Sequence, residues 1–401
     1  MAEKQNIPEI RFEGFTDPWE QRKFSDLTDR VSIQSRDPDL PQVEYEDIIS
    51  GEGTLNKDLR DKEGGKTGIK FYAGDVLYGK LRPYLMNWLY PQFNGVAVGD
   101  FWVLRATECD SSFLYRLVQT DSFQRLANVS SGSKMPRADW NLISQSFFAV
   151  PVDHTEQKVI AKSLAELDNL ITLHQRKYDK LCTVKKSMLD KMFPKPGETE
   201  PEIRFEGFTD PWEQRKLGDM GTTYGGLTGK SKEDFGHGAA WFVPYTNVFD
   251  NPVGDSTRLE RVEIDPSQNV VRRGDALFTV SSETPEEVGM SSVWPSDLDD
   301  LYLNSFCFGY RQDGSFDPSY LAYMLRADSF RNQIEMLAQG ISRFNISKGK
   351  VMEIEVPVPN KREQARIGRL FVDLDSLITL HQRKLELLRN IKKSLLDRMF
   401  V

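Results

Sequence analysis

The sequence predicts a mixed α/β (α+β) protein: two domains joined by a pair of long antiparallel coiled-coil helices, with a pseudo-twofold internal repeat. Three observations predict this fold. Both ends of the first half of the chain recur in the second half, each half closes with a long amphipathic stretch, and the segments between mix short strand-like and helix-like runs. Strands interleaved with a few helices are typical of a compact α/β or α+β domain.

The length and composition are those of a globular protein with more than one domain. The 401 residues are 39% hydrophobic and 28% charged, which is enough to bury a core without disulfides or metals. No segment approaches the roughly 18 apolar residues of a membrane span. The N-terminal residues lack the apolar region of a signal peptide, so we expect a cytoplasmic protein.

Cysteine and histidine usage argues against disulfides and metals. The three cysteines are odd in number and widely spaced, which indicates buried, reduced thiols. The four histidines form no pair at metal-ligand spacing, so we expect no metal site and no cofactor in this chain. These residues are Cys109, Cys182, Cys307, His154, His174, His237 and His381.

The net charge of −8 argues, as an average, against a nucleic-acid partner. The charge is unevenly distributed, however. Residues 156–195 carry a net +4 and residues 363–401 a net +3, so the rest of the chain sums to −15. An acidic body with two basic helices indicates that any contact with DNA is made by local loops or by a larger assembly.

The internal repeat consists of an opening frame and a closing frame. The opening frame PEIRFEGFTDPWEQRK occupies 8–23 and recurs unchanged at 201–216, and the closing frame ends at VKKSMLDKMF in one half and IKKSLLDRMF in the other. Between them the two halves diverge. We expect the alike ends to meet each other and two copies of one partner, and the unlike middles to face two different targets. A recent duplication with drifting loops is the alternative.

Each closing frame is predicted to be a helix of about 40 residues. Asp153 with Glu156, and Asn360 with Glu363, place a candidate N-cap three residues before an acid, as in a capping box. The first helix ends at the Pro/Gly/Glu-rich linker KPGETEPE. We expect a first domain at 1–153, a first spacer helix at 154–195, a linker and second domain at 196–360, and a second spacer helix at 361–401.

Apolar residues recur every three or four positions along both stretches, which is the spacing of a coiled-coil seam. Because a whole domain separates the helices, they most simply pack antiparallel on each other, and docking of each helix on a different protein is the alternative. The seam positions are Ile160, Leu164, Leu167, Ile171, His174, Tyr178, Leu181, Ile367, Phe371, Leu374, Ile378, His381, Leu385 and Leu388.

Polar residues on these helices have structural interpretations. His174 and His381 hold corresponding seam positions, where a polar residue more often fixes register than catalyses. The lysines near the end of each helix are interpreted as solvated or partner-facing, with phosphate contact as the alternative. They are Lys185, Lys186, Lys392 and Lys393, of which Lys185 and Lys392 interrupt the apolar stripe.

No catalytic motif is found. GGLTGKS at 225–231 resembles a phosphate-binding loop, but Tyr224 stands where that loop needs its first glycine, and no apolar strand leads into it. GxGxxG, GxSxG, a PD...ExK nuclease cluster and the Asn/Asp-Pro-Pro-aromatic motif of amino-methyltransferases are also missing. We therefore expect no catalytic residue in this chain.

What remains are cations beside glycines in predicted loops, where the backbone can approach phosphate closely. Such clusters can position a duplex, with Arg, Asn or Gln reading base edges, although an ordinary solvated loop is the alternative for each. The candidate DNA-binding residues are Lys80, Arg82, Lys134, Arg137, Lys230, Lys232, Arg343, Lys348 and Lys350.

These features together resemble the specificity subunits of type I restriction-modification systems. The resemblance rests on the opening frame of each half, on the turns GDVLY (74–78) and GDALF (274–278), on the Val-Pro-Val segments before Glu-Gln, and on the LHQRK...KKS-x-LD-x-MF helices. It covers essentially the whole chain.

The resemblance implies two target recognition domains at opposite ends of an antiparallel coiled coil, each reading one half of a bipartite, asymmetric site in double-stranded DNA. It further implies that the coiled coil sets the unread gap and, with the frames, docks two modification (methyltransferase) subunits that bring S-adenosylmethionine. Restriction (helicase-nuclease) subunits, with ATP and Mg, are implied as additional partners. Base-reading residues are not carried over, because the recognition domains are the variable part.

Two functions from other classes stay open at this point. A coiled-coil scaffold protein would join its partners without DNA sequence preference. An enzyme acting alone would need a cofactor site, which the sequence does not supply.

Overall fold

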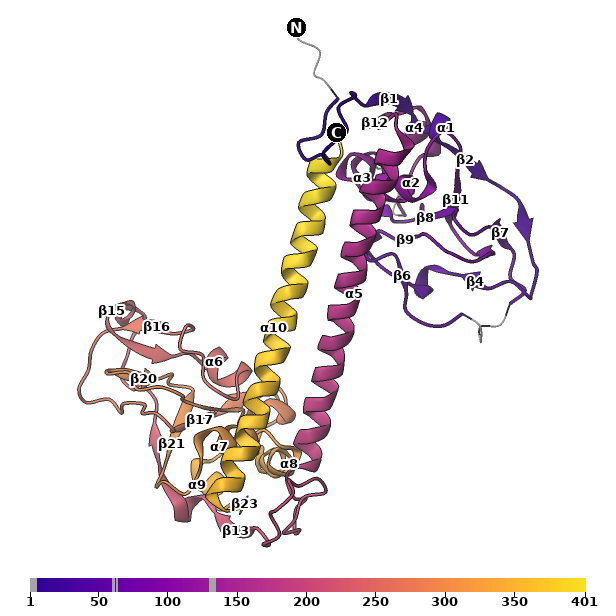
Figure 1. The fold of residues 1–401 in the computed structure, drawn as a ribbon. Helices are drawn as coiled ribbons and strands as arrows, with labels where there is room; N and C mark the ends of the chain where they lie inside the picture. Colours follow the sequence, from indigo (N-terminus) through magenta and orange to yellow (C-terminus); the bar gives the residue numbers. More distant parts are fainter. Residues whose placement is uncertain (1–5, 60–61, 63, 130–134) are drawn as a thin grey trace. The chain divides into compact units, whose positions relative to one another are not determined.

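The computed structural model divides into two compact units, each of which contains part of both long helices, α5 (His154–Lys191) and α10 (Lys361–Met399) (Figure 1). Unit 1 comprises residues 1–176 and 382–401, and unit 2 comprises residues 177–381. The predicted fold class is confirmed: both units are rich in β-structure, and the two long helices pack together. The structure describes residues 6–59, 62, 64–129 and 135–401.

Unit 1 is built on three small sheets and one hairpin, with short helices between them. The central sheet is antiparallel with the order β2-β11-β8-β9, and a second sheet has the order β3-β7-β10-β4. The strands are β1 (Glu20–Lys23), β2 (Thr28–Val31), β3 (Gln34–Ser35), β4 (Gln42–Val43), β5 (Ile48–Ile49), β6 (Thr54–Leu55), β7 (Gly68–Phe71), β8 (Val76–Gly79), β9 (Trp88–Leu89), β10 (Gly95–Ala97), β11 (Phe101–Ala106) and β12 (Phe147–Val150). The short helices are α1 (Phe24–Leu27), α2 (Ser111–Leu117), α3 (Asp121–Ala127) and α4 (Trp140–Gln145), with 3₁₀ turns η1 (Tyr45–Asp47) and η2 (Pro83–Leu85).

Unit 2 repeats the central part of this plan. Its sheet β14-β21-β17-β19 has the same antiparallel order as β2-β11-β8-β9. Its second sheet, β16-β15-β20, has three strands where that of unit 1 has four, and each of these sheets contains one parallel pair, β15–β20 and β4–β10. The strands are β13 (Glu213–Lys216), β14 (Gly221–Gly225), β15 (Phe235–Val243), β16 (Glu260–Val262), β17 (Ala276–Thr279), β18 (Ser281–Ser282), β19 (Ser291–Val293), β20 (Leu301–Leu303), β21 (Cys307–Gln312), β22 (Phe344–Asn345) and β23 (Glu355–Val358). The short helices are α6 (Tyr245–Asp250), α7 (Pro318–Met324), α8 (Asp328–Leu337) and α9 (Lys348–Met352), with 3₁₀ turns η3 (Leu217–Met220), η4 (Lys232–Asp234) and η5 (Pro285–Glu287).

The Gly-Asp turns that enter β8 and β17 are fixed by the same two devices. Gly74 and Gly274 have φ of +90° and +84°, a left-handed conformation that strongly favours glycine. The following aspartates, Asp75 and Asp275, are buried and each pairs with an arginine of the neighbouring strand, at 2.7 Å in both units. The repeated turn is therefore a structural feature of the central sheet.

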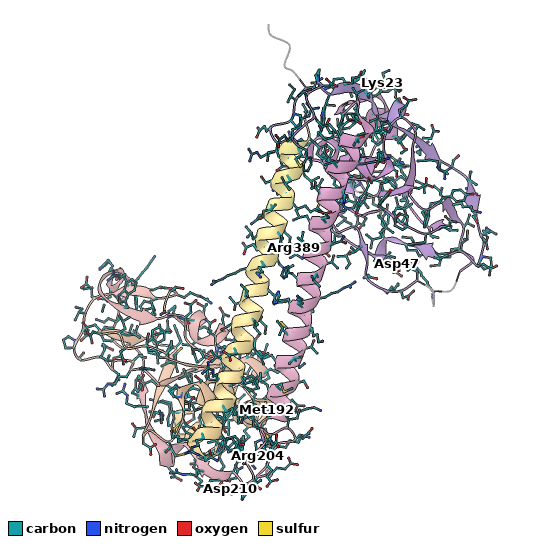
Figure 2. All side chains as sticks on the ribbon, in the orientation of Figure 1. Lys23, Asp47, Met192, Arg204, Asp210 and Arg389 are labelled. Carbon is teal, nitrogen blue, oxygen red and sulfur yellow. The ribbon has the colours of Figure 1, made fainter. Side chains whose placement is uncertain are left out.

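A buried arginine–glutamate pair ties each opening frame to the start of a long helix. Arg11 donates two hydrogen bonds to Glu156 at 2.7 and 2.8 Å, and Arg204 donates two to Glu363 at 2.7 and 2.9 Å. This corrects the predicted capping box: Asn360 does accept from the backbone of Glu363, but both glutamate side chains turn to the frame arginines. Figure 2 places Arg204 beside Asp210, whose carbonyl it also contacts.

The end of one long helix closes against the opening frame in both units. In unit 2 the Ile203 amide donates to the Lys191 carbonyl at 2.9 Å, within one continuous stretch of chain. In unit 1 the equivalent Ile10 amide donates to the Arg398 carbonyl at 3.0 Å, between the two ends of the chain. The same contact between a helix end and an opening frame therefore forms in both units. In unit 2 the two segments are joined by a short linker, and in unit 1 they are not adjacent in sequence.

The two helices run antiparallel in each unit. In unit 1, Asp168 of α5 pairs with Lys392 of α10 at 2.7 Å. In unit 2, Lys185 of α5 pairs with Asp375 of α10 at 2.5 Å. These pairs are repeat-related copies of one contact, so two of the lysines interpreted as solvated or partner-facing are in fact held within the chain.

Every predicted seam residue is buried or half-buried. Those that are buried are Ile160, Leu164, Ile171, Ile367, Phe371, Leu374 and Leu385, and the others, His174 and His381 among them, are half-buried. Among the helices in the described part of the chain, none has both the length and the apolar character required to cross a membrane.

The thiols differ in environment. Burial raises the pKa of Cys109 and of Cys307 to about 12, while Cys182 is only half-buried, contrary to the expectation that all three are buried. The thiols of an unfolded chain ionise near their ordinary pKa of about 9, whereas the two buried thiols of the folded chain stay neutral to higher pH. The stability that these neutral thiols contribute is therefore complete below about pH 9 and is lost as the pH rises toward 12.

We predict that Ellman's reagent at pH 8 modifies one thiol of the native full-length chain rapidly and the other two only on unfolding, because buried neutral thiols are poor nucleophiles. The Cys182→Ser variant should then show no fast phase. Rapid modification of two or three thiols in the native protein would contradict the assignment.

A second prediction concerns the shared carboxylate at Asp168, which also accepts from the buried Arg116 at 2.5 Å. Asp168→Asn leaves two nearly buried cations without their counter-ion and should cost about 3 kcal/mol of unfolding free energy. Asp375→Asn, its repeat-related control, leaves one lysine and the Tyr323 hydroxyl and should cost about 1 kcal/mol. Urea unfolding with hydrogen exchange read separately in each unit measures both, and equal losses would refute the prediction.

Candidate nucleic-acid interface

In unit 1, two of the predicted loop clusters come together. Leu81 and Arg137 form an isolated antiparallel bridge. The Arg82 amide donates to the Pro136 carbonyl at 2.8 Å, and the Ala138 amide donates to the Lys80 carbonyl at 2.8 Å. Segments about 55 residues apart in sequence therefore lie side by side and present Lys80, Arg82 and Arg137 from one surface.

The charges on this surface are partly neutralised. Asp100 lies 3.4 Å from the Lys80 ammonium and 3.1 Å from the Arg137 guanidinium. Arg82 is exposed, and no ion pair is found for it within the described residues. Arg82 therefore offers the freest cation of the three to a phosphate or a base edge. Lys134, the fourth candidate in this cluster, lies outside the described residues.

The loop after β8 carries backbone strain. Arg82 and Met86 have φ of +50° and +53°, in the left-handed region that non-glycine residues avoid at about 1–2 kcal/mol each. Between them the short turn η2 exposes Tyr84 and Leu85, which are 54% and 39% accessible. Strain held at an exposed, cationic and apolar loop tip is typical of a binding surface. The pattern of cations beside glycines indicated Arg82 but gave no signal for Tyr84, Leu85 or Met86.

A hollow of about 460 Å³ lies beside these cations. Lys80 and Arg137 line it together with Trp102 and Trp140, and the guanidinium of Arg30 lies 4.9 Å above the Trp140 ring. Trp102 is 3% exposed, so of the two rings only the half-buried Trp140, beside the Arg30 guanidinium, can offer a stacking surface to a base. Arg30 and the two tryptophans gave no sequence signal, since they lie in strands or short helices far from any glycine-rich loop.

Unit 2 pairs the corresponding loops in the same way. Strand β18 pairs with β22, and the Ile346 amide donates to the Val280 carbonyl at 3.1 Å, as Ala138 does to Lys80 in unit 1. The exposed Arg343 sits at the start of this pair, where its Nε donates to Ser281 Oγ at 2.7 Å. The exposed Lys348 and Lys350 follow directly in α9.

The two remaining candidates lie elsewhere in unit 2. Lys230 is held 3.0 Å from Asp265, and the exposed Lys232 begins η4 just before β15. Figure 1 places β15 and β16 at the far end of this unit from α9. Unit 2 therefore presents two separate cationic patches rather than one. The GGLTGKS segment lies between β14 and η4, without the helix that follows a phosphate-binding loop.

In the described residues, no group of three or more His, Cys, Asp or Glu side chains is arranged to hold a metal ion. His237, the exposed histidine of unit 2, lies 2.9 Å from Glu263 at the surface. What these surfaces can do chemically is to donate hydrogen bonds and screen phosphate charge.

The known proteins to which this chain is similar are specificity proteins of type I restriction-modification systems. Residues 209–390 match the type I restriction modification DNA specificity domain. The specificity subunit of the type I restriction enzyme MjaVIII from Methanocaldococcus jannaschii is 24% identical over 302 residues, which cover 72% of this chain and 68% of that subunit. Similarity at this level of identity extends over most of both proteins.

Two solved structures share the fold. The S subunit of a type I restriction-modification system from M. genitalium aligns with a TM-score of 0.57 and 14% identity, covering 98% of this chain and 99% of that one. A chain from a structural study of type I R-M complex assembly and conformational transition aligns with a TM-score of 0.54 and 18% identity, covering 95% and 97%. Nearly the whole fold is therefore common to all three.

Proposed function

Because this chain belongs to the DNA specificity subunits of type I restriction-modification systems, we propose that its two units read the two halves of a bipartite, asymmetric site in double-stranded DNA. One observation carries the proposal. The units share their frames and central sheets, yet the same paired loops carry Lys80, Arg82 and Arg137 in unit 1 and Ser281, Arg343 and Asn345 in unit 2. Alike scaffolds with unlike loop residues suit two different half-sites.

Recognition at each unit separates positioning from reading. Exposed cations such as Arg82 and Lys348 contact phosphates, which supplies affinity without sequence information. Arginine and asparagine side chains on the paired loops donate to base edges, and a good bidentate contact discriminates by about 1–3 kcal/mol. Trp140 and the exposed loop tip after β8 add apolar contact to bases.

The repeated parts of the chain suit a repeated partner. Two modification subunits dock on the duplicated helices and frames and bring S-adenosylmethionine, while restriction subunits add ATP- and Mg-dependent cleavage. As a specificity subunit this chain supplies recognition, and the catalytic activities belong to its partners. The acidic net charge is compatible with this division, because partner subunits contribute phosphate contacts of their own.

The central test exchanges one recognition region. Replacing residues 24–150 with those of another specificity subunit, in the complex with the modification partner, should change one half of the methylated sequence and leave the other half intact. Sequencing of methylated genomic DNA reads both halves at once. A scaffold without sequence preference would give no defined site before or after the exchange, and a change in both halves would also refute the assignment.

A narrower prediction concerns Arg82. In the assembled complex, Arg82→Ala should weaken DNA binding about tenfold. The negative slope of log affinity against log salt concentration should become shallower by about 1, because one phosphate contact is lost. Arg125→Ala in α3 removes a side chain of equal charge, 80% exposed, from the same unit and serves as the matched control. Equal effects of the two variants would mean that Arg82 acts only through net charge.

A further inference from the structure

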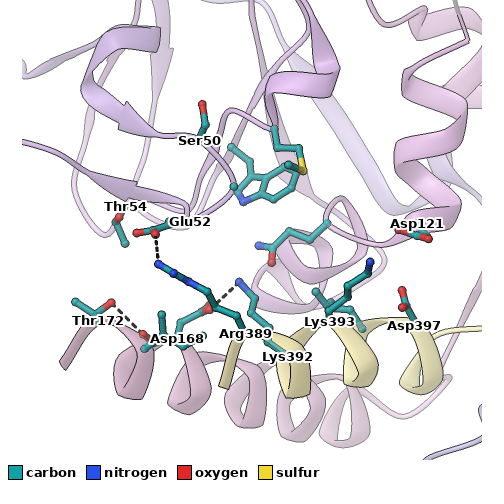
Figure 3. Close-up of a pocket in the computed structure, with 16 residues that line it drawn as sticks. Ser50, Glu52, Thr54, Asp121, Asp168, Thr172, Arg389, Lys392, Lys393 and Asp397 are labelled. Atoms are coloured by element: carbon teal, nitrogen blue, oxygen red, sulfur yellow. Dashed lines mark hydrogen bonds and ion pairs between the residues drawn. The ribbon is translucent and has the colours of Figure 1, made fainter. Parts of the chain in front are cut away.

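Unit 1 contains a second pocket, which shares Met86 with the loop after β8 but is lined by none of Lys80, Arg82 and Arg137. It has a volume of about 530 Å³ and lies among the β5–β6 hairpin, strand β9, the α2–α3 turn and the parts of α5 and α10 that belong to this unit (Figure 3). Met86, Trp88, Ile171 and Leu396 give it apolar walls. Pockets of 300–1,000 Å³ with apolar walls and a few polar groups are the usual size for small organic ligands.

Two buried donors of this pocket have no acceptor among the residues that the structure describes. Trp88 is 4% exposed and Gln119 is 7% exposed, and within those residues neither the indole Nε1 nor the amide Nε2 has a hydrogen-bond partner. The other end of the Gln119 amide is engaged, because its Oε1 accepts from Arg116 at 3.4 Å. Buried donors without partners are uncommon and costly, at about 1–3 kcal/mol each. The pocket therefore calls for a ligand with acceptor oxygens.

The other repeat fills the equivalent position with its own chain. The counterpart of Gln119 is Arg326, whose guanidinium donates to the carbonyls of Ser291, Val248 and Phe249 at 2.7 to 2.9 Å. Ser291 is also the counterpart of Trp88, because each is the first residue of the strand, β9 or β19, that pairs with β8 or β17. In unit 2, carbonyl oxygens of the chain itself therefore occupy the position at which unit 1 has a pocket and the two unpaired donors Trp88 Nε1 and Gln119 Nε2.

Most of the charges around the pocket are already paired. Arg389 lies 3.1 Å from Glu52, and Lys392 lies 2.7 Å from Asp168 (Figure 3). Figure 3 shows Lys393 projecting from α10 at the pocket, on the side of Asp121 and Asp397. No ion pair of Lys393 is found within the described part of the chain, so its ammonium is available to a negative group.

Glycines allow the hairpin wall to approach closely. Gly53 has a φ of +67°, and a Cβ on it would lie 1.9 Å from the Tyr115 hydroxyl oxygen and 3.1 Å from the Trp88 ring. The segment between β5 and β6 can therefore cover the tryptophan only because it has no side chain at this position. The salt bridge between Arg389 and Glu52 then holds the segment between β5 and β6 to α10.

We propose that this pocket binds a small organic carboxylate with an apolar body. Its carboxylate accepts from Trp88 Nε1 and Gln119 Nε2 and lies near the Lys393 ammonium, while its apolar part packs on Met86, Ile171 and Leu396. Binding orders the hairpin against both helices of unit 1 and stabilises this unit by mass action.

The test adds 2-naphthoate as the probe to the full-length chain. Saturation-transfer NMR measures its binding, and the thermal unfolding midpoint measures the stabilisation that binding gives. We expect saturable binding and a raised midpoint with 2-naphthoate and neither with 2-naphthylmethylammonium. Trp88→Phe, which removes the donor but keeps a ring, and Gln119→Glu, which replaces the donor by an acceptor, should each weaken binding about tenfold or more.

The internal repeat supplies the matched control. Lys393→Ala should weaken 2-naphthoate about tenfold, and Lys186→Ala, its exposed counterpart in unit 2, should leave binding unchanged. No binding at up to about 5 mM probe would overturn the proposal. Equal binding of 2-naphthoate and 2-naphthylmethylammonium would also overturn it. The same holds if Trp88→Phe, Gln119→Glu and Lys393→Ala bind 2-naphthoate as well as Lys186→Ala does, because the named donors would then play no part.

Discussion

The buried pair between a frame arginine and the first turn of a long helix is the interaction on which both units depend. Arg11 and Arg204 each make two short hydrogen bonds to a glutamate that is at most 1% exposed. A buried carboxylate without its partner would be strongly destabilising, whereas the bidentate pair is well satisfied. The pair fixes where the frame crosses the helix, and the adjacent Gln157 and Gln364 then bind the amides of Asp110 and Asp317 at 2.7 Å and so position α2 and α7. The Glu-Gln dipeptide therefore orients each recognition unit on its helix.

The repeat made the scaffold predictable. Sixteen unchanged residues, a three-four apolar spacing and Gly-Asp turns are local signals, and each corresponds to a structure that any copy of the sequence would form. The helix pair was predicted from periodicity, and observed helices end only a few residues inside the expected bounds, at Lys191 and Met399. What periodicity could not supply was the long-range partners. Nothing in the spacing around Lys185 or Lys392 indicates Asp375 or Asp168, because those contacts join positions that only the antiparallel register brings together.

The candidate interface was predictable only in part, for a similar reason. Glycines beside cations identified Arg82 and Arg343 as loop residues, and both lie on the paired loops. Lys230 shows the limit of that signal: it has the same local sequence context, but Asp265, 35 residues away, holds its ammonium at 3.0 Å. Trp140 shows the opposite failure, since its place beside the candidate cations and under the Arg30 guanidinium is indicated by no local motif. Side chains that read a ligand are selected by the surface they share, and that surface exists only after folding.

The carboxylates beside the candidate cations bear on specificity as well as on charge balance. Asp100 between Lys80 and Arg137 competes with any phosphate that approaches them, so a random DNA sequence must displace an internal partner to gain a contact of similar strength. Such competition lowers sequence-independent binding, which depends on these phosphate contacts, more than it lowers binding to a site that adds base-edge hydrogen bonds. Because a specificity protein must find one site among a large excess of others, the ratio of the two affinities matters more than either alone. An acidic recognition surface with a few exposed cations, such as Arg82, therefore favours discrimination, and the affinity it gives up can be restored by partners that touch the backbone elsewhere.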